Sequence, residues 1–127
     1  MRLAIDTNAY SDFSRGVSSR IEVFRTANEI FLPTIVLGEL QAGFACGGQR
    51  RKNEEHLNRF LRSRRVLVLS VDEETAVHYA SVYQSLVQQG TMIPTNDIWI
   101  AAIVIQHGLV LCTSDAHFRH VPHLPTC

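Results

Sequence analysis

The sequence predicts an α/β domain in which a mostly parallel central sheet is flanked by helices on both faces. Four short apolar runs of strand length alternate along the chain with longer stretches that have helical periodicity. Parallel neighbouring strands need a helix between them to return the chain, so this alternation favours a parallel sheet. No repeat, low-complexity segment or linker divides the sequence, and we therefore expect one domain over residues 1–127.

Composition sets limits on location and partners. The formal net charge is zero, so any nucleic-acid or membrane partner must be held by a local patch. The three cysteines are odd in number and lack C-x-x-C spacing, which favours free thiols in a reducing compartment over a disulfide framework. No apolar run is long enough to span a bilayer. We therefore expect a cytoplasmic protein with no membrane partner.

The first strand is expected over residues 3–5, an apolar run that stops at Asp6. Either Thr7 or Asn8 is expected to cap the helix that follows. A weakly helical stretch then leads to a second short strand over residues 29–32. Asp6 is therefore expected at the end of a central strand.

The next helix is opened by Pro33 and Thr34 and is stopped by a pair of glycines that begins at Gly47. Glu39 falls in the second turn of this helix. It lies beside the apolar stripe of the helix rather than opposite it, so its carboxylate is expected near the buried side.

A basic helix is predicted within residues 49–65, where seven Lys or Arg residues stand against two Glu residues. Its candidates for contact with RNA phosphates are Arg50, Arg51, Lys52, Arg59 and Arg62. A solvated helix face without a ligand is the alternative explanation of these charges.

Residues 66–69 are apolar and β-branched, which predicts a buried strand. Ser70 and Glu73 fit the S-x-x-E capping box, so a helix is expected to begin here and to continue to Gly90. Its apolar positions recur at helical spacing and are expected to face the core: Ala76, Tyr79, Ala80, Tyr83, Leu86 and Val87.

The stretch 93–105 predicts a helix buried in the middle of the domain, because it is apolar on every side after its first turn. Pro94 suits a helix entrance, and Thr95 or Asn96 is expected to cap the first turn. Asp97 falls in that turn, where the helix dipole favours a carboxylate, so this residue alone would need no role beyond the helix.

A last buried strand is predicted over residues 109–112 and ends at Thr113, Ser114 and Asp115. A short strand or an irregular tail is expected after it.

Four acids far apart in the sequence occur at or near the ends of the predicted elements: Asp6, Glu39, Asp97 and Asp115. Ligands of parallel α/β sheets bind outside the carboxyl ends of the strands, where the strand order reverses, and we expect the four carboxylates to converge there. Carboxylates so close together repel one another unless a cation holds them.

Mg²⁺ or Mn²⁺ suits this all-oxygen set of ligands, and the lack of His or Cys among them argues against zinc. The chemistry expected of such a site is hydrolysis of a phosphodiester. His117, His120 and His123 recur every three residues, but Pro122 and Pro125 argue against a regular helix, so we do not expect a histidine metal site.

Four motifs resemble the PIN-domain ribonucleases, and most closely the VapC-type toxins of bacterial toxin–antitoxin pairs. The motifs are D-T-N at 6–8, G-E-L at 38–40, N-D-x-W-I-A-A at 96–102, and T-S-D followed by H-F at 113–118. They occur in the family's order over essentially the whole chain, and the resemblance implies a single PIN-like domain.

The resemblance implies a metal-dependent endoribonuclease in which Asp6, Glu39, Asp97 and Asp115 form the catalytic, metal-binding pocket for Mg²⁺ or Mn²⁺. Thr7 and Asn8 would support the pocket by hydrogen bonds, as would Ser114. Asn96 stands where some relatives carry a further acid, which leaves the number of metal ions open.

The same resemblance implies three partners: RNA, often transfer RNA; an antitoxin protein whose tail blocks the acidic pocket; and a second copy in a homodimer. Phe13, Phe24 and Phe44 are candidates for a groove that accepts an antitoxin helix, although core packing explains each of them as well.

Two alternatives remain open at this stage. One is a non-catalytic PIN-fold module that binds RNA or protein. The other is a haloacid dehalogenase-like phosphatase with Asp6 as its nucleophile, which is disfavoured because Asn8 stands where that family has a second Asp.

Overall fold

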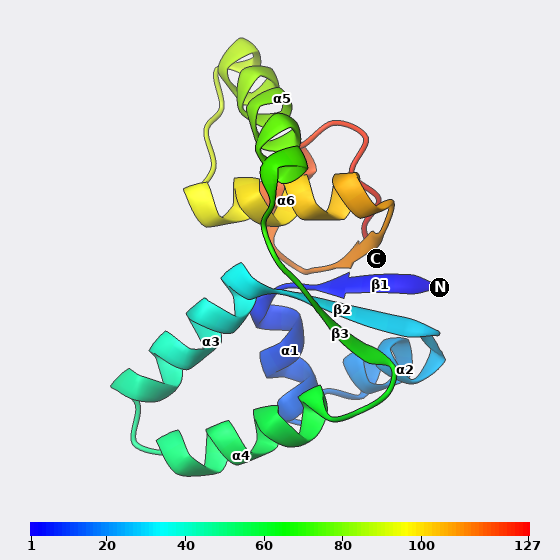
Figure 1. The fold of residues 1–127 in the computed structure, drawn as a ribbon, viewed down its shortest axis with the longest axis vertical. Coiled ribbons are helices and arrows are strands. Elements are labelled where there is room, and N and C mark those ends of the chain that lie inside the picture. The colour runs from blue at the N-terminus through cyan, green and yellow to red at the C-terminus, as the bar shows by residue number, and fades with distance from the viewer.

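Four parallel strands form one sheet in the computed structural model, which describes all residues from 1 to 127 (Figure 1). The strands are β1 (Arg2–Ile5), β2 (Glu29–Pro33), β3 (Val66–Leu69) and β4 (Val110–Cys112), and they lie in the order β3-β2-β1-β4. All three strand pairs are parallel. The predicted parallel sheet is therefore confirmed, and its apolar runs are the strands.

Helices cover both faces of this sheet, as predicted. The helices are α1 (Thr7–Ser14), α2 (Ser18–Thr26), α3 (Thr34–Cys46), α4 (Arg50–Leu61), α5 (Glu73–Gln89) and α6 (Thr95–His107). In Figure 1, α1 to α4 lie on one side of the strands and α5 and α6 on the other. None of the helices combines the length and the apolar character that crossing a membrane requires.

The strand order places a reversal point between β1 and β4. The chain leaves β1 toward β2 and β3 on one side, and β4 pairs with β1 on the other side. The carboxyl ends of β1 and β4 therefore border the crevice in which α/β sheets bind ligands. Asp6 directly follows β1, and Asp115 follows β4 by three residues.

The core lies around α6, whose residues from Ile98 to Val104 are buried except for the half-buried Trp99. Ile98, Ile100, Ile103 and Val104 are each 1% exposed or less. The helix ends at Gly108, whose backbone is left-handed (φ 62°), a conformation that glycine adopts without strain. The buried central helix is thus confirmed, and it holds the first turn of α6 at a fixed place beside the sheet.

Three predicted helix caps are wrong. Asp6 itself caps α1, with its Oδ1 accepting from the backbone N–H of Ala9 at 2.8 Å, so neither of the two residues after it serves as the cap. Asp72 caps α5 by a reciprocal pair of bonds with Thr75, instead of the predicted Ser70. The residue before α6 is Pro94, which has no side-chain cap bond to offer.

Strand β3 and helix α5 are more exposed than predicted. Leu67 is 42% exposed because β3 is the edge strand of the sheet. Helix α5 packs on α6 mainly through Thr75, Val82 and Leu86. The predicted stripe lies partly outside this contact: Ala76, Ala80, Tyr83 and Val87 are exposed. Apolar side chains cover a wide sector of the surface of helix α5, and only some of them pack against α6.

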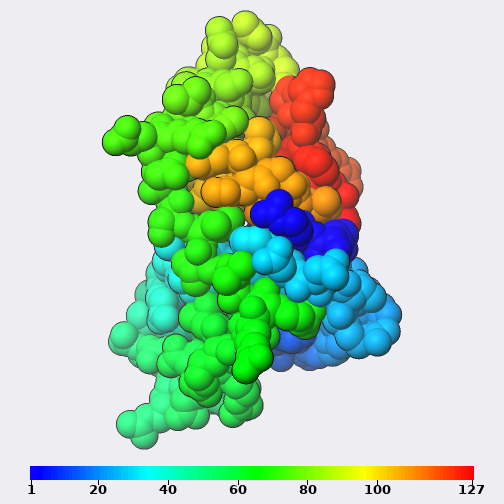
Figure 2. Space-filling model, turned by 45° about the vertical axis from the view of Figure 1, so that its right-hand side comes forward, coloured from blue at the N-terminus to red at the C-terminus, as the bar shows by residue number.

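The end of the chain is a short 3-10 helix, η1 (Ala116–His120), followed by one isolated bridge between Leu111 and Thr126. Figure 2 shows these C-terminal residues, coloured red, against the orange residues of the α6 and β4 region. The predicted short strand or irregular tail is confirmed only as a tail, because a single bridge is all the strand pairing that it makes.

Shortening Ile103 to alanine is expected to lower the free energy of unfolding by about 2–4 kcal/mol, because the side chain is fully buried in α6 and its removal leaves a cavity. Val17→Ala is the control: its side chain is 39% exposed, and the expected loss is about 0.5 kcal/mol. Urea denaturation followed by circular dichroism measures both. Equal losses would contradict the central place of α6 in the core.

Candidate functional site

A cavity of about 160 Å³ opens at the carboxyl ends of β1 and β4, and all four predicted carboxylates line it. We call it the acidic cavity, and its residues are Asp6, Thr7, Asn8, Glu39, Asp97, Ile100 and Asp115. Each acid comes from a different part of the fold: the end of β1, α3, the first turn of α6, and the turn before η1. The predicted convergence of the four acids is confirmed.

Asp6 is the most buried of the four acids, at 4% exposure. Its two oxygens have separate partners: Oδ1 accepts from the N–H of Ala9, and Oδ2 accepts from the hydroxyl of Thr113. Burial raises the pKa of Asp6, and Asp115 adds to the rise, while the hydrogen bonds from Thr113 and Ala9 and the charge of Arg20 oppose it. Asp6 is therefore held in one orientation by the first turn of α1 and by the residue that directly follows β4.

Glu39 is fixed by side chains from two other helices. Thr7 donates its hydroxyl hydrogen to Oε1 at 2.6 Å, and Asn96 donates its amide to Oε2 at 3.4 Å. Thr7 therefore has the supporting hydrogen bond that the sequence predicted. Asn96 was predicted as a possible helix cap and noted as the replacement of an acid, and the structure shows it holding Glu39.

Asp97 and Asp115 lie next to each other and share a neighbour, His117. The ring Nδ1 of His117 is 3.1 Å from Asp97 Oδ2 and 3.1 Å from Asp115 Oδ1. Burial raises the pKa of Asp97, and the charges of Asp115 and Glu39 add to the rise, whereas His117 opposes it. The charge of Asp115 thus lies close enough to Asp97 to disfavour the ionised form of Asp97.

Thr113 joins the strand ends and was not among the predicted site residues. Its hydroxyl donates to Asp6 and accepts from the backbone N–H of Asp115 at 2.9 Å. Ser114, which was predicted to support the pocket, instead accepts a hydrogen bond from Arg20 through its hydroxyl oxygen. A hydroxyl residue two positions before the last acid is the feature of the sequence from which Thr113 could have been found.

Asn8 lacks a contact that was predicted, and Arg20 makes contacts that were not. Asn8 lines the acidic cavity but makes no hydrogen bond to a carboxylate, so its predicted supporting bond is absent. Arg20 had no predicted role, yet its guanidinium contacts the Sγ of Cys112 at 2.8 Å and Asp12 at 3.7 Å. This cation lies near enough to Asp6 to oppose the rise in its pKa.

The donor set of the acidic cavity fits a divalent cation. Four carboxylates gather in one small space, two of them with raised pKa values, and hard oxygen donors of this kind suit Mg²⁺ or Mn²⁺. One expectation is corrected: the group contains a histidine, because Asp97, Asp115 and His117 each offer a ligand atom within 4.8 Å of the others. The absence of nitrogen donors can therefore not be used to argue against other metals.

Helix α4 carries the predicted basic residues on an exposed face. Arg51, Lys52, Arg59 and Arg62 are exposed, while Arg50 pairs with Glu54 at 2.7 Å. The helix packs against α3, the helix that carries Glu39. The basic face and the acidic cavity are thus linked through one helix.

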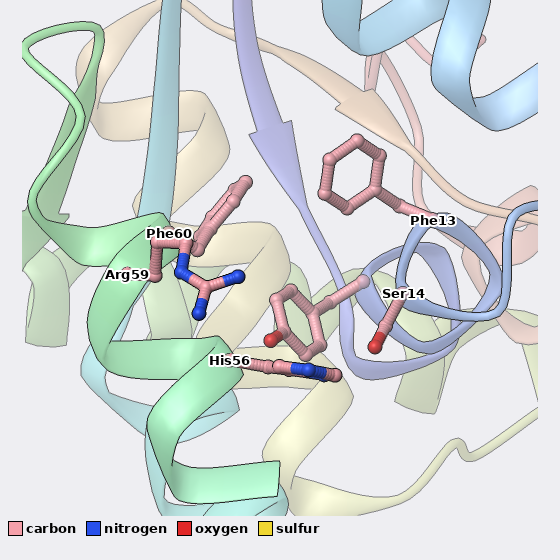
Figure 3. A pocket seen from close by; sticks show the side chains of 6 residues that line it. Phe13, Ser14, His56, Arg59 and Phe60 are labelled. Carbon is pink, nitrogen blue, oxygen red and sulfur yellow. The ribbon is translucent and has the colours of Figure 1, made fainter. Parts of the chain in front are cut away.

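An aromatic hollow of about 310 Å³ lies between α1 and α4, lined by Tyr10, Phe13, Ser14, His56, Arg59 and Phe60 (Figure 3). Phe13 stacks on Phe24 with ring centroids 4.5 Å apart, and Phe60 packs against both. Of the three phenylalanines predicted for a groove, Phe13 lines the hollow, Phe44 lines a separate one, and Phe24 is a core residue at 1% exposure. Figure 3 shows that charged and aromatic side chains of α4 face α1 across the opening.

The chain is similar to several known proteins. Ribonuclease VapC2 of Rickettsia felis is 28% identical to the chain over 107 residues, which is 84% of this chain and 78% of the relative. The crystal structure of VapBC2 from Rickettsia felis bound to a promoter DNA fragment matches with a TM-score of 0.87 and 26% identity, covering 100% of this chain and 98% of that one.

The DNA-bound VapBC structure from Salmonella typhimurium has the same fold, with a TM-score of 0.88 at 23% identity, and covers 100% of this chain and 97% of its own. The PIN domain family matches residues 3–124. This match spans nearly the whole chain and contains every acid of the cavity, and it excludes the haloacid dehalogenase-like alternative. The chain belongs to the PIN-domain family.

Proposed function

We propose that the protein is a metal-dependent endoribonuclease and the toxin of a VapBC-type toxin–antitoxin pair. One observation carries the proposal: four carboxylates from separate elements line a single cavity at the point where the strand order reverses. The relatives add the kind of reaction, because the similar protein from Rickettsia felis is named a ribonuclease. The intact acid set favours a catalyst over a non-catalytic module of the same fold.

Asp6, Glu39, Asp97 and Asp115 would hold Mg²⁺ or Mn²⁺ in this proposal. When bound, the ion would neutralise charge on the scissile phosphate and activate the water that replaces the leaving oxygen. Thr7, Asn96 and Thr113 keep the carboxylates oriented before any ion binds, because each donates a hydrogen bond to one of them. The protein's own residues therefore supply negatively charged ligands that are already held in place for the ion.

RNA must approach this negative site in spite of its own charge. We propose that the exposed basic face of α4, formed by Arg51, Lys52, Arg59 and Arg62, contacts the RNA phosphates. Arg50 has its own carboxylate partner in Glu54 and contributes less. Transfer RNA is the substrate that the family resemblance implies.

The aromatic hollow supports the proposed antitoxin partner. VapBC complexes are toxin–antitoxin assemblies, and we propose that an antitoxin segment places an apolar side chain against Phe13 and Phe60. Phe24 forms the floor beneath them, because it is buried and stacks on Phe13. The opening lies on the C-terminal half of α1, the helix whose N-terminus Asp6 caps.

A homodimer in the cytoplasm completes the proposal. Helix α5 leaves three large apolar side chains on the surface: Val77 at 69% exposure, Val87 at 55% and Tyr83 at 45%. Such a face is costly in water and is typical of a surface that self-associates. The cytoplasm is where the proposed RNA substrate is found.

Replacing Asp97 with asparagine is expected to lower the rate of RNA cleavage by about 10²-fold or more, because the cavity loses one of its four charges. The assay uses total cellular RNA with Mn²⁺ or Mg²⁺, and with chelator as the metal-free control. Asp12→Asn is the matched variant, since Asp12 is an acid of α1 outside the acidic cavity. An Asp97→Asn protein that cuts RNA at the normal rate would overturn the assignment.

The metal-free protein is expected to be less stable than its Asp97→Asn variant at pH 7. Since the folded-state pKa values of Asp6 and Asp97 are raised, the folded protein holds more protons than the unfolded chain, and its stability falls as the pH rises through that window. We expect the variant to gain a few tenths to about 1 kcal/mol at neutral pH. The gain should vanish below about pH 3.9, where the carboxylate is protonated in both states.

Millimolar Mn²⁺ is expected to reverse this order in thermal denaturation, because an ion that binds only the folded wild-type cavity stabilises it. An Asp97→Asn variant that Mn²⁺ stabilises as strongly as the wild type would show that the ion binds elsewhere.

The double substitution Arg51→Ala with Lys52→Ala is expected to weaken RNA binding and to reduce the salt dependence of binding by about 1.4 units of logarithmic slope, the value for two lost phosphate contacts on a single strand. Filter binding in chelator, where RNA stays intact, measures both quantities. Arg25→Ala is the control, because Arg25 is an exposed cation of α2 already paired with Glu22 at 2.7 Å. An unchanged slope would show that these α4 residues do not contact RNA phosphates and form only a solvated surface.

A further inference from the structure

His117 places an imidazole nitrogen beside two of the acids that line the acidic cavity. Its Nδ1 lies 3.1 Å from an oxygen of Asp97 and 3.1 Å from an oxygen of Asp115. The side chain is 48% exposed, whereas the side chains of Asp97 and Asp115 are 14% and 27% exposed. The imidazole therefore reaches inward from the solvent side of the two acids.

The backbone, rather than chance, directs His117 to this place. Asp115 caps η1 and accepts from the N–H of His117 at 2.9 Å, so the turn that presents the carboxylate also presents the imidazole. His120, three residues later, does not belong to the group that could hold a metal ion. Of the three regularly spaced histidines, only His117 belongs to it.

The spacing of the three donor atoms suits a metal ion. Ligands that lie about 2.1 Å from an ion at right angles are roughly 3 Å apart, which matches both distances from Nδ1. The Nδ1 atom therefore faces the same space as the two carboxylate oxygens.

A nitrogen donor changes which ions the site prefers. Mg²⁺ binds oxygen almost exclusively, whereas first-row transition ions accept imidazole readily. Mn²⁺ is the member of that series whose ligand preference lies nearest to Mg²⁺. A difference between Mn²⁺ and Mg²⁺ is therefore the most stringent comparison.

We propose that His117 Nδ1 is a metal ligand together with Asp97 and Asp115, and that it makes the site select first-row transition ions such as Mn²⁺ over Mg²⁺. The proposal rests on the proposed metal-dependent function and adds to it a ligand outside the four acids. It assigns a specificity-determining role to a residue of this chain.

The test is calorimetric titration of the purified protein with Mn²⁺ and with Mg²⁺. His117→Ala is expected to weaken Mn²⁺ binding by about 10-fold or more and Mg²⁺ binding by less than about 3-fold. His117→Gln, which offers an oxygen in place of the nitrogen, should restore Mg²⁺ binding better than Mn²⁺ binding. His120→Ala is the control, because His120 is an exposed residue of the same 3-10 helix outside the metal-ligand group.

Pulsed electron paramagnetic resonance gives a second readout that does not depend on activity. Mn²⁺ bound to the wild-type protein should show coupling to a ¹⁴N nucleus, and Mn²⁺ bound to His117→Ala should not. Absence of this coupling in the wild type would overturn the proposal. So would a His117→Ala protein that binds Mn²⁺ more tightly, since His117 would then be a cation that competes with the metal.

Asp97→Asn in the same titrations separates this proposal from the proposed function. If Asp97→Asn loses both ions while His117→Ala keeps its preference for Mn²⁺, the carboxylate site stands and the histidine ligand is wrong. If Asp97→Asn binds both ions normally, the acidic cavity is not the metal site, and the proposed function fails with it.

Discussion

The gathering of four carboxylates in one partly buried cavity is the constraint on which the rest of this structure depends. The fold brings Asp6, Glu39, Asp97 and Asp115 to one small cavity, and burial there raises the pKa values of two of them. Hydrogen bonds from neighbouring side chains and the charge of Arg20 offset part of this cost. The negative charge that is not offset favours binding of a divalent cation, and the bound cation in turn favours a phosphodiester substrate. The site therefore lowers the stability of the metal-free fold and raises its affinity for the cation.

The sheet and the buried helix could be predicted because their signals are local. Apolar runs of three or four residues and the all-round apolar character of α6 follow from the sequence alone, and the four acids could be placed from the rule for parallel sheets. What could not be predicted depends on position in the assembled fold. Leu67 is exposed because β3 has no outer neighbour, and Tyr83 is exposed because α6 covers only one side of α5.

The four acids of the site were predicted, but most of the side chains that orient them were not. Asp6 caps α1 while it lines the cavity, a double use that a search for Ser or Thr caps overlooks. Thr113 orients Asp6 from 107 residues away in the sequence, and Asn96 orients Glu39 from 57 residues away, so both pairings arise only in the assembled fold. His117 was set aside because the prolines near it exclude a regular α-helix. A 3-10 turn of five residues suffices to bring it to the acids.

Anomalous diffraction from crystals soaked in Mn²⁺ would show whether the four carboxylates bind a metal ion. We expect a single strong peak, or a close pair of peaks, inside the acidic cavity and in contact with Asp6, Asp97 and Asp115. Manganese bound only at other sites, with the four carboxylates left in contact with water or protons, would contradict it. The function would then have to be sought in the surfaces of the fold rather than in its charged crevice.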